Sequence, residues 1–221
     1  MFLRRFLKQR LSNWSQDTDG SVSIEFVLVF PLLALWLGAS FVWFDAFRAK
    51  SLMSKTAYTV TDYTSRLVRP TQAELDRVFL MHKKLLPRRQ TADGWLRLSS
   101  ICWNGTDHRV VWSYIGDDTY ANAIADPNDD IDPRLLPLTD DEIPLEIIPS
   151  MSVNDSVILV DVYSYWKPLV SWAGFQPTDL NVSLVSRPRF VDILRVVDGL
   201  PGYPFSDADG DGIDFQLCPD D

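Results

Sequence analysis

The chain has 221 residues, of which 46% are hydrophobic and 23% are charged, and its formal net charge at pH 7 is -9. This length and apolar content suit one membrane anchor and one folded domain, and they argue against a globally disordered chain. After residue 50 the chain carries 15 basic and 26 acidic residues. So acidic a domain repels phosphates, which argues against nucleic acid as a partner.

The first predicted element is an apolar helix. Residues 26–44, FVLVFPLLALWLGASFVWF, carry no charge, and a helix of this length spans about 28 Å, close to the thickness of a bilayer's hydrocarbon core. Basic residues precede it within residues 1–10, so the positive-inside bias predicts a cytoplasmic N-terminus and an exported remainder. A secretory signal peptide is the alternative, but its apolar core would have about 7–15 residues and end at a small-x-small site.

The start of this helix carries the form of a prepilin cleavage site. In the stretch GSVSIEF, Gly20 ends a basic leader, Ser21 would be the new N-terminus and Glu25 stands at its fifth place. Phe26 follows the glutamate, and Pro31 lies inside the apolar run, where it is predicted to kink the helix. On these residues, DGSVSIEFVLVFPLLALWLG resembles the opening of TadE-like proteins, the pseudopilin and pilus-assembly components of tight-adherence (Flp) pilus systems.

The resemblance implies a non-enzymatic, single-pass protein of the bacterial inner membrane, with its C-terminal domain in the periplasm. It implies that Glu25 lies in a bundle of N-terminal helices and pairs there with a neighbour's free α-amine, and that Phe26 and Pro31 belong to the same assembly motif. The expected partners are the membrane, other pilus-assembly components or pilins, and a prepilin peptidase. An anchored periplasmic binding or adhesion domain outside any pilus is the alternative, and an anchored hydrolase is a further hypothesis.

Two helices are predicted to follow the apolar run. Residues 45–69 contain no helix breaker, so the membrane helix is expected to continue as an amphipathic helix. Its apolar positions recur three or four residues apart: Ala46, Ala49, Met53, Ala57, Val60, Tyr63 and Leu67. A second helix is expected at 72–86, because Thr71 and Glu74 form a capping-box pattern and Pro87 ends the run.

Four strands complete the predicted domain. They are expected at 94–103, 108–116, 156–166 and 180–190, with Asn104-Gly105 as a hairpin turn and Pro188 ending the last strand or placing it at an edge. The expected fold class is α+β, with a transmembrane helix extended into a long amphipathic helix packed on a small, mainly antiparallel sheet. The resemblance makes this architecture pilin-like. Residues 117–151, rich in prolines and acids, are predicted to form a long surface loop with a short helix at 139–143.

The chain therefore divides into four predicted segments. They are a basic cytoplasmic leader (1–20), a transmembrane anchor (21–47), a periplasmic α+β domain (48–205) and an acidic tail (206–221). The two cysteines, Cys102 and Cys218, are too few for a disulfide scaffold. Outside the cytoplasm they can form one disulfide bond, and otherwise they are two unpaired small apolar side chains.

The tail contains a calcium-loop pattern, SDADGDGID. Asp207, Asp209 and Asp211 stand at positions 1, 3 and 5 of such a loop, Ile213 would offer its carbonyl at position 7, and Asp214 is a substitute ligand. Position 12 is Cys218 in place of the usual glutamate. A weak calcium site and a solvated acidic turn both remain open.

Catalytic signals are few. His82 is predicted to be a solvated residue of the second helix, and His108 an ordinary residue at the start of an edge strand. Arg187 and Arg189 in SRPRF are expected either to bind an acidic partner or to close off an edge strand. The hydrolase hypothesis requires one of the two histidines to line a pocket beside a nucleophile.

Overall fold

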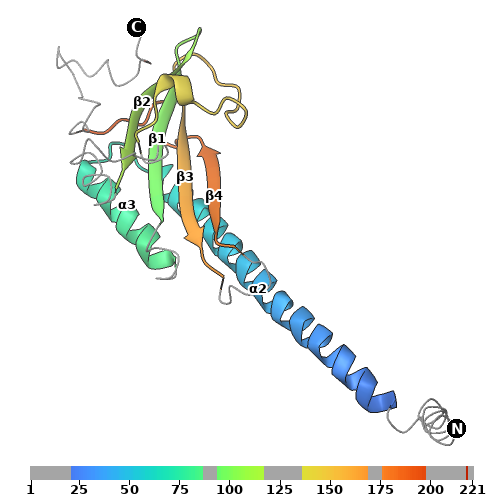
Figure 1. Ribbon diagram of the computed structural model, residues 1–221. Coiled ribbons are helices and arrows are strands. Elements are labelled where there is room, and N and C mark those ends of the chain that lie inside the picture. The colour runs from blue at the N-terminus through green and yellow to red at the C-terminus, as the bar shows by residue number, and fades with distance from the viewer. Residues whose placement is uncertain (1–20, 87–93, 117–135, 169–175, 198–217, 219–221) are drawn as a thin grey trace, which may run out of the picture. The chain divides into compact units, whose positions relative to one another are not determined.

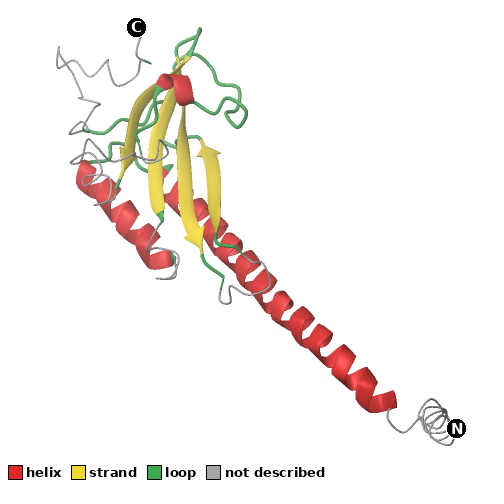
Figure 2. Ribbon diagram, in the orientation of Figure 1, coloured by secondary structure: helices red, strands yellow, loops and turns green. Residues whose placement is uncertain are grey.

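The computed structural model describes residues 21–86, 94–116, 136–168, 176–197 and 218, and its fold is α+β, as predicted (Figures 1 and 2). The described residues divide into two compact units, one containing residues 21–46 and the other containing residues 47–86, 94–116, 136–167, 176–197 and 218. Gly20 and the calcium-like pattern of the tail lie outside the described residues.

Helix α2 (Ser21–Thr64) is the element shared by both units. Within the described part of the chain it is the one helix long and apolar enough to cross a membrane. In its N-terminal half large apolar residues such as Leu32 and Trp36 are 69% and 70% exposed. A helix that exposes such residues around its circumference suits a bilayer better than water.

The C-terminal half of α2 is amphipathic, as predicted. Ala49, Met53, Ala57 and Val60 are buried on one face. The prediction of Tyr63 as the next member of this stripe is wrong, because its side chain is 42% exposed. Thr64 occupies the position instead, one helical turn after Val60, and its hydroxyl donates to the Val60 carbonyl at 2.9 Å, which allows a polar residue to be buried there.

Helix α3 (Gln72–Leu85) begins with the predicted capping box. The Thr71 hydroxyl accepts from the Glu74 amide at 3.3 Å, and the Glu74 carboxylate accepts from the Thr71 amide at 3.0 Å. The prediction of a solvated His82 is wrong, since this side chain is only 3% exposed. His82 lies three and four residues after the buried Phe79 and Val78, so helix periodicity turns it toward the core.

The strands form one antiparallel sheet in the order β2-β1-β3-β4. They are β1 (Trp95–Trp103), β2 (His108–Ile115), β3 (Ser156–Trp166) and β4 (Thr178–Ser186). Gly105 has a φ of 102°, a conformation that glycine adopts without strain, and it turns the chain between β1 and β2. β4 ends before Pro188 and is an edge strand, and His108 opens the other edge strand, both as predicted.

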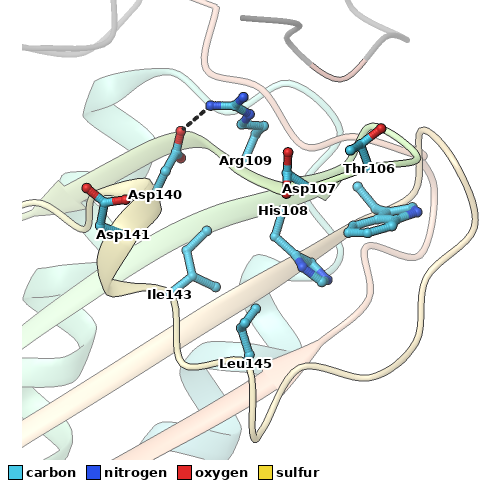
Figure 3. Close-up of a pocket in the computed structure, with 9 residues that line it drawn as sticks. Thr106, Asp107, His108, Arg109, Asp140, Asp141, Ile143 and Leu145 are labelled. Atoms are coloured by element: carbon cyan, nitrogen blue, oxygen red, sulfur yellow. Dashed lines mark hydrogen bonds and ion pairs between the residues drawn. The ribbon is translucent and has the colours of Figure 1, made fainter.

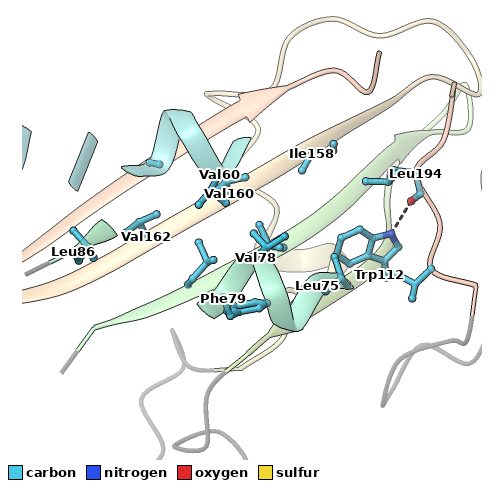
Figure 4. Packing of buried hydrophobic residues seen from close by; sticks show 14 of the residues in the cluster. Val60, Leu75, Val78, Phe79, Leu86, Trp112, Ile158, Val160, Val162 and Leu194 are labelled. Atoms are coloured by element: carbon cyan, nitrogen blue, oxygen red, sulfur yellow. Dashed lines mark hydrogen bonds between the residues drawn. The ribbon is translucent and has the colours of Figure 1, made fainter. Parts of the chain in front are cut away.

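The main core lies between one face of the sheet and the two helices (Figure 4). Leu75, Val78 and Phe79 of α3 join the α2 stripe there. They pack on alternate strand residues, Leu96, Leu98, Trp112, Ile158, Val160 and Val162. The Trp112 indole N–H donates to the Leu194 carbonyl at 2.6 Å, so the segment after β4 closes this core.

The second face of the sheet is covered by part of the predicted surface loop. Leu138 and Ile143 are buried there against Ile101, Val157 and Leu159. Most of residues 136–151 are exposed, as the prediction of a surface loop requires, but Leu138 and Ile143 are buried, because alternate residues of buried strands leave an apolar second face that must be covered. The short helix expected at 139–143 is present as a single 3₁₀ turn, η2 (Asp140–Glu142).

Gly116 is expected to tolerate no side chain. A Cβ atom at this position would lie 2.2 Å from the ring of Phe79, which is buried in the main core. We expect Gly116→Ala to lower the free energy of unfolding by about 1–3 kcal/mol, the usual cost of overpacking a core. Urea unfolding of the full chain in non-ionic detergent measures it. The double variant Gly116→Ala with Phe79→Leu should be less destabilised than the sum of its two single variants.

Tyr114 connects β2 to α3 and should make the fold sensitive to alkali. Its hydroxyl donates to Asp76 at 2.6 Å, and burial, followed by this hydrogen bond, raises its pKa from 10.0 to about 12. A raised pKa in the folded state means that its stabilising effect is present below pH 10 and is lost as the pH rises toward 12. We expect Tyr114→Phe to flatten the decline in stability across this range, as measured by unfolding at several pH values.

Candidate functional site

The residues of the predicted processing and assembly motif lie at the start of α2. Glu25, Phe26 and Pro31 are all exposed residues of this helix, and the Phe26 ring stacks on that of Phe30 with centroids 5.1 Å apart. Ser21 is the first residue of α2. One helix therefore presents the glutamate together with the apolar side chains that would contact a bilayer or other helices.

Cys102 and Cys218 are joined by a disulfide bond, with Cα atoms 5.7 Å apart. Both residues are buried, and Ile193 packs beside them. The Cys218 amide donates to the side-chain carbonyl of Asn154 at 3.1 Å. Asn154 itself has a positive φ of 64°, which asparagine adopts more readily than most residues. The bond thus ties residue 218 to the end of the sheet where β1 turns into β2.

The same end of the sheet carries an open pocket of about 510 Å³ (Figure 3). One wall comes from the β1–β2 hairpin, with Trp103 and residues 106–109. The other wall comes from η2 and the residues after it, with Asp140, Asp141, Ile143 and Leu145. The pocket thus lies between the β1–β2 hairpin and residues 140–145, which belong to the segment (residues 136–151, the covering segment) that covers the second face of the sheet.

Hydrogen bonds and ring contacts hold both walls of this pocket. The Asp140 carboxylate accepts from the Val110 amide at 2.6 Å and pairs with Arg109 at 3.2 Å, which fixes η2 against β2. The Trp103 and His108 rings meet across the hairpin with centroids 4.5 Å apart. In the hairpin turn the Asn104 side-chain carbonyl accepts from the amides of Thr106 and Asp107 at 2.9 and 2.8 Å.

No family model, no curated protein and no solved structure is significantly similar to this chain. Function must therefore be argued from the residues and their arrangement alone.

His108 is the histidine that lines the pocket. Among the described residues it makes the ring contact with Trp103 and has no hydrogen bond to Thr106, the hydroxyl residue of the lining. A nucleophile activated by a histidine needs such a bond, either directly or formed when substrate arrives. Within the described ranges, three or more potential metal ligands do not gather at any point.

The arginines of SRPRF have partners inside the chain. Arg189 pairs with Asp62 of α2, and its amide donates to the Ser65 carbonyl at 2.8 Å. Arg187 pairs with Asp155 at 3.4 Å and donates to the Ser150 carbonyl at 2.9 Å. Both arginines thus tie the segment after β4 to other elements, a role that the sequence analysis did not anticipate.

The sequence analysis also missed a buried ion pair on the second face of the sheet. Arg97 of β1 donates through two nitrogens to one oxygen of Asp161 in β3, at 2.8 and 3.1 Å, and through a third to the Leu136 carbonyl at 3.1 Å. A signal for it was present, since each residue is the one charge within an otherwise uncharged predicted strand. The pair links two strands to the start of the covering segment.

Proposed function

We propose that this chain is a non-enzymatic, membrane-anchored, pseudopilin-like component of a tight-adherence pilus system. One observation carries the proposal, namely that α2 begins with the processing motif, exposes apolar residues in its first half and supplies a core stripe to the domain in its second half. A helix of this kind can join a bundle of like helices in the membrane and still hold a folded domain outside it.

The disulfide bond supports a periplasmic location for the domain in this proposal. Structural disulfides persist in oxidising compartments and are rare in the bacterial cytoplasm. Cys102 and Cys218 both belong to the second unit, which contains the described residues within 47–167 and 176–218. The positive-inside bias predicts that this unit lies on the opposite side of the membrane from the N-terminus. The proposed topology is thus a single pass of the inner membrane with the N-terminus in the cytoplasm.

The test of the proposal is processing. We expect a prepilin peptidase to cut between Gly20 and Ser21, so that the intact mass falls by that of residues 1–20 when the enzyme is co-expressed. Gly20→Phe should abolish the shift, whereas a bulky residue at Ser40, within the same helix but away from the motif, should leave it unchanged. A mature protein whose N-terminal sequence still begins at residue 1 in the presence of active peptidase would contradict the proposal.

Glu25 is expected to matter for assembly and not for insertion. A carboxylate at the edge of the bilayer costs little, whereas one inside a helix bundle is retained only if it is paired. We expect Glu25→Ala to insert normally and to reduce cross-linking to partner subunits at least about tenfold, equal to about 1.4 kcal/mol. Membrane fractionation and in-cell cross-linking measure the two effects, and equal loss in Asp45→Ala would show that the effect is not specific to Glu25.

An anchored binding or adhesion domain that never enters a pilus is the second candidate. The open pocket at the hairpin end of the sheet favours it, because a structural pilus subunit does not require a ligand pocket. Under this hypothesis Gly20 stays uncut, and the protein remains a monomer in the membrane. The mass measurement described above therefore separates the two candidates.

A further inference from the structure

The pocket at the hairpin end has an apolar floor and an acidic rim. Trp103, Ile143 and Leu145 supply the apolar surface, and Leu145 is 62% exposed although it is a large aliphatic residue. Asp107 lies on the hairpin side and Asp140 and Asp141 lie on the η2 side (Figure 3). An exposed leucine and a tryptophan beside carboxylates form a surface that can bind an apolar stem ending in a positive charge.

The charge of the pocket comes from two of its residues. Arg109 and Asp140 neutralise each other in their ion pair, and the second Asp140 oxygen already accepts from the Val110 amide. The carboxylates of Asp107 and Asp141 have no ion pair with any described residue, so they contribute two negative charges to the pocket lining. They can accept hydrogen bonds from a ligand without breaking a bond of the fold.

We propose that this pocket binds an arginine side chain carried on an exposed segment of a partner protein. A guanidinium group is planar, so it can stack on the Trp103 ring while its fork of N–H groups reaches Asp107 or Asp141. The methylene stem would lie against Ile143 and Leu145. The inference does not depend on the proposed function, because the pocket would bind the same group in a pilus component or in a free-standing binding domain.

The probe is a pair of short peptides, acetyl-Ser-Leu-Arg-Ser-amide and the same peptide with citrulline, the neutral isostere of arginine. Binding to the full chain in non-ionic detergent is measured by titration calorimetry. We expect the arginine peptide to bind about fivefold more tightly than the citrulline peptide at low salt, which is the upper effect of one exposed ion pair. The difference should shrink as salt is added.

Three variants make the test specific. Asp107→Asn and Asp141→Asn should each weaken arginine binding about two- to fivefold, and together they should remove the preference over citrulline. Asp179→Asn changes the net charge equally but lies in β4, where it pairs with Tyr165 at the opposite end of β3, and it should leave binding unchanged. Equal binding of both peptides, or equal weakening by all three variants, would overturn the proposal.

Discussion

Replacing Arg97 by methionine is expected to lower the free energy of unfolding by about 3–5 kcal/mol, the usual effect of breaking a buried ion pair. The side chains of Arg97 and Asp161 are only 13% and 11% exposed, so the substitution would leave a largely buried carboxylate without the two hydrogen bonds that Arg97 donates to it. It would also release the Leu136 carbonyl, which accepts the third bond. Urea unfolding of the full chain, followed by circular dichroism, measures the change.

The double variant Arg97→Met with Asp161→Leu tests whether the loss of stability comes from leaving the Asp161 carboxylate buried without its partner. With both charges gone, no buried carboxylate remains unpaired, and we expect most of the lost stability to return. Arg66→Met is the matched control, because Arg66 pairs with Asp62 on the surface of α2 at the same distance of 2.8 Å, with side chains 56% and 44% exposed. That substitution should change stability by less than about 1 kcal/mol. If Arg97→Met and Arg66→Met lower the free energy of unfolding by similar amounts, the expected difference between the buried and the exposed ion pair is contradicted.

Removing the disulfide bond is expected to cost about 2–5 kcal/mol. Cys102 and Cys218 are 116 residues apart, so the bond closes a long loop of the chain in its unfolded state. Cys102→Ala should lower the urea midpoint and should also loosen the attachment of residue 218 at Asn154. The measurement is urea unfolding with and without reductant, and reductant should affect the native chain and not the variant.

Two further observations test the disulfide prediction. The single variants and the double variant Cys102→Ala with Cys218→Ala should be destabilised to a similar extent, since each removes the same bond. Protein taken from the periplasmic side and alkylated under denaturing conditions without reductant should gain no label. Two labelled thiols in that experiment would show that the bond is absent from the exported protein, and the proposed topology would then lose its main support.

The elements of this fold could be predicted from local sequence because each follows from a few strong signals. The Thr71–Glu74 capping box, the Asn104-Gly105 turn and the β-branched run of β3 act over short distances. The burial of two residues was not predicted. Thr64 is buried in α2 where Tyr63 was expected, and His82 is buried in α3 although it was expected to be solvated. For His82 the spacing from Val78 and Phe79 was the correct signal, whereas at Tyr63 and Thr64 either residue fits a three- or four-residue spacing and only the packing of the domain decides which one is buried.

The pocket could not have been predicted, because its two walls, the β1–β2 hairpin and residues 140–145, come from distant parts of the sequence. Sequence placed Asp140 and Asp141 in an acidic loop and placed His108 on an edge strand, without any sign that these residues meet. These residues line one pocket because the Asp140 carboxylate accepts a hydrogen bond from the Val110 amide, 30 residues earlier in the sequence. By contrast, the anchor motif is contained within residues 20–31, so its residues could be named without a structure.

The sharing of α2 between the apolar anchor segment and the domain core has a mechanical consequence. A force applied to the N-terminal half of α2 would pass through the backbone hydrogen bonds of this helix to the buried face formed by Ala49, Met53, Ala57 and Val60. When a force acts parallel to a row of packed side chains, all of their contacts resist it together. When it acts at one end and perpendicular to the row, the contacts break one at a time. The ion pair between Arg189 and Asp62 also connects the end of this helix to the segment after β4. A protein held in a membrane and pulled from outside would therefore resist extension through its core, without needing a separate mechanical linker.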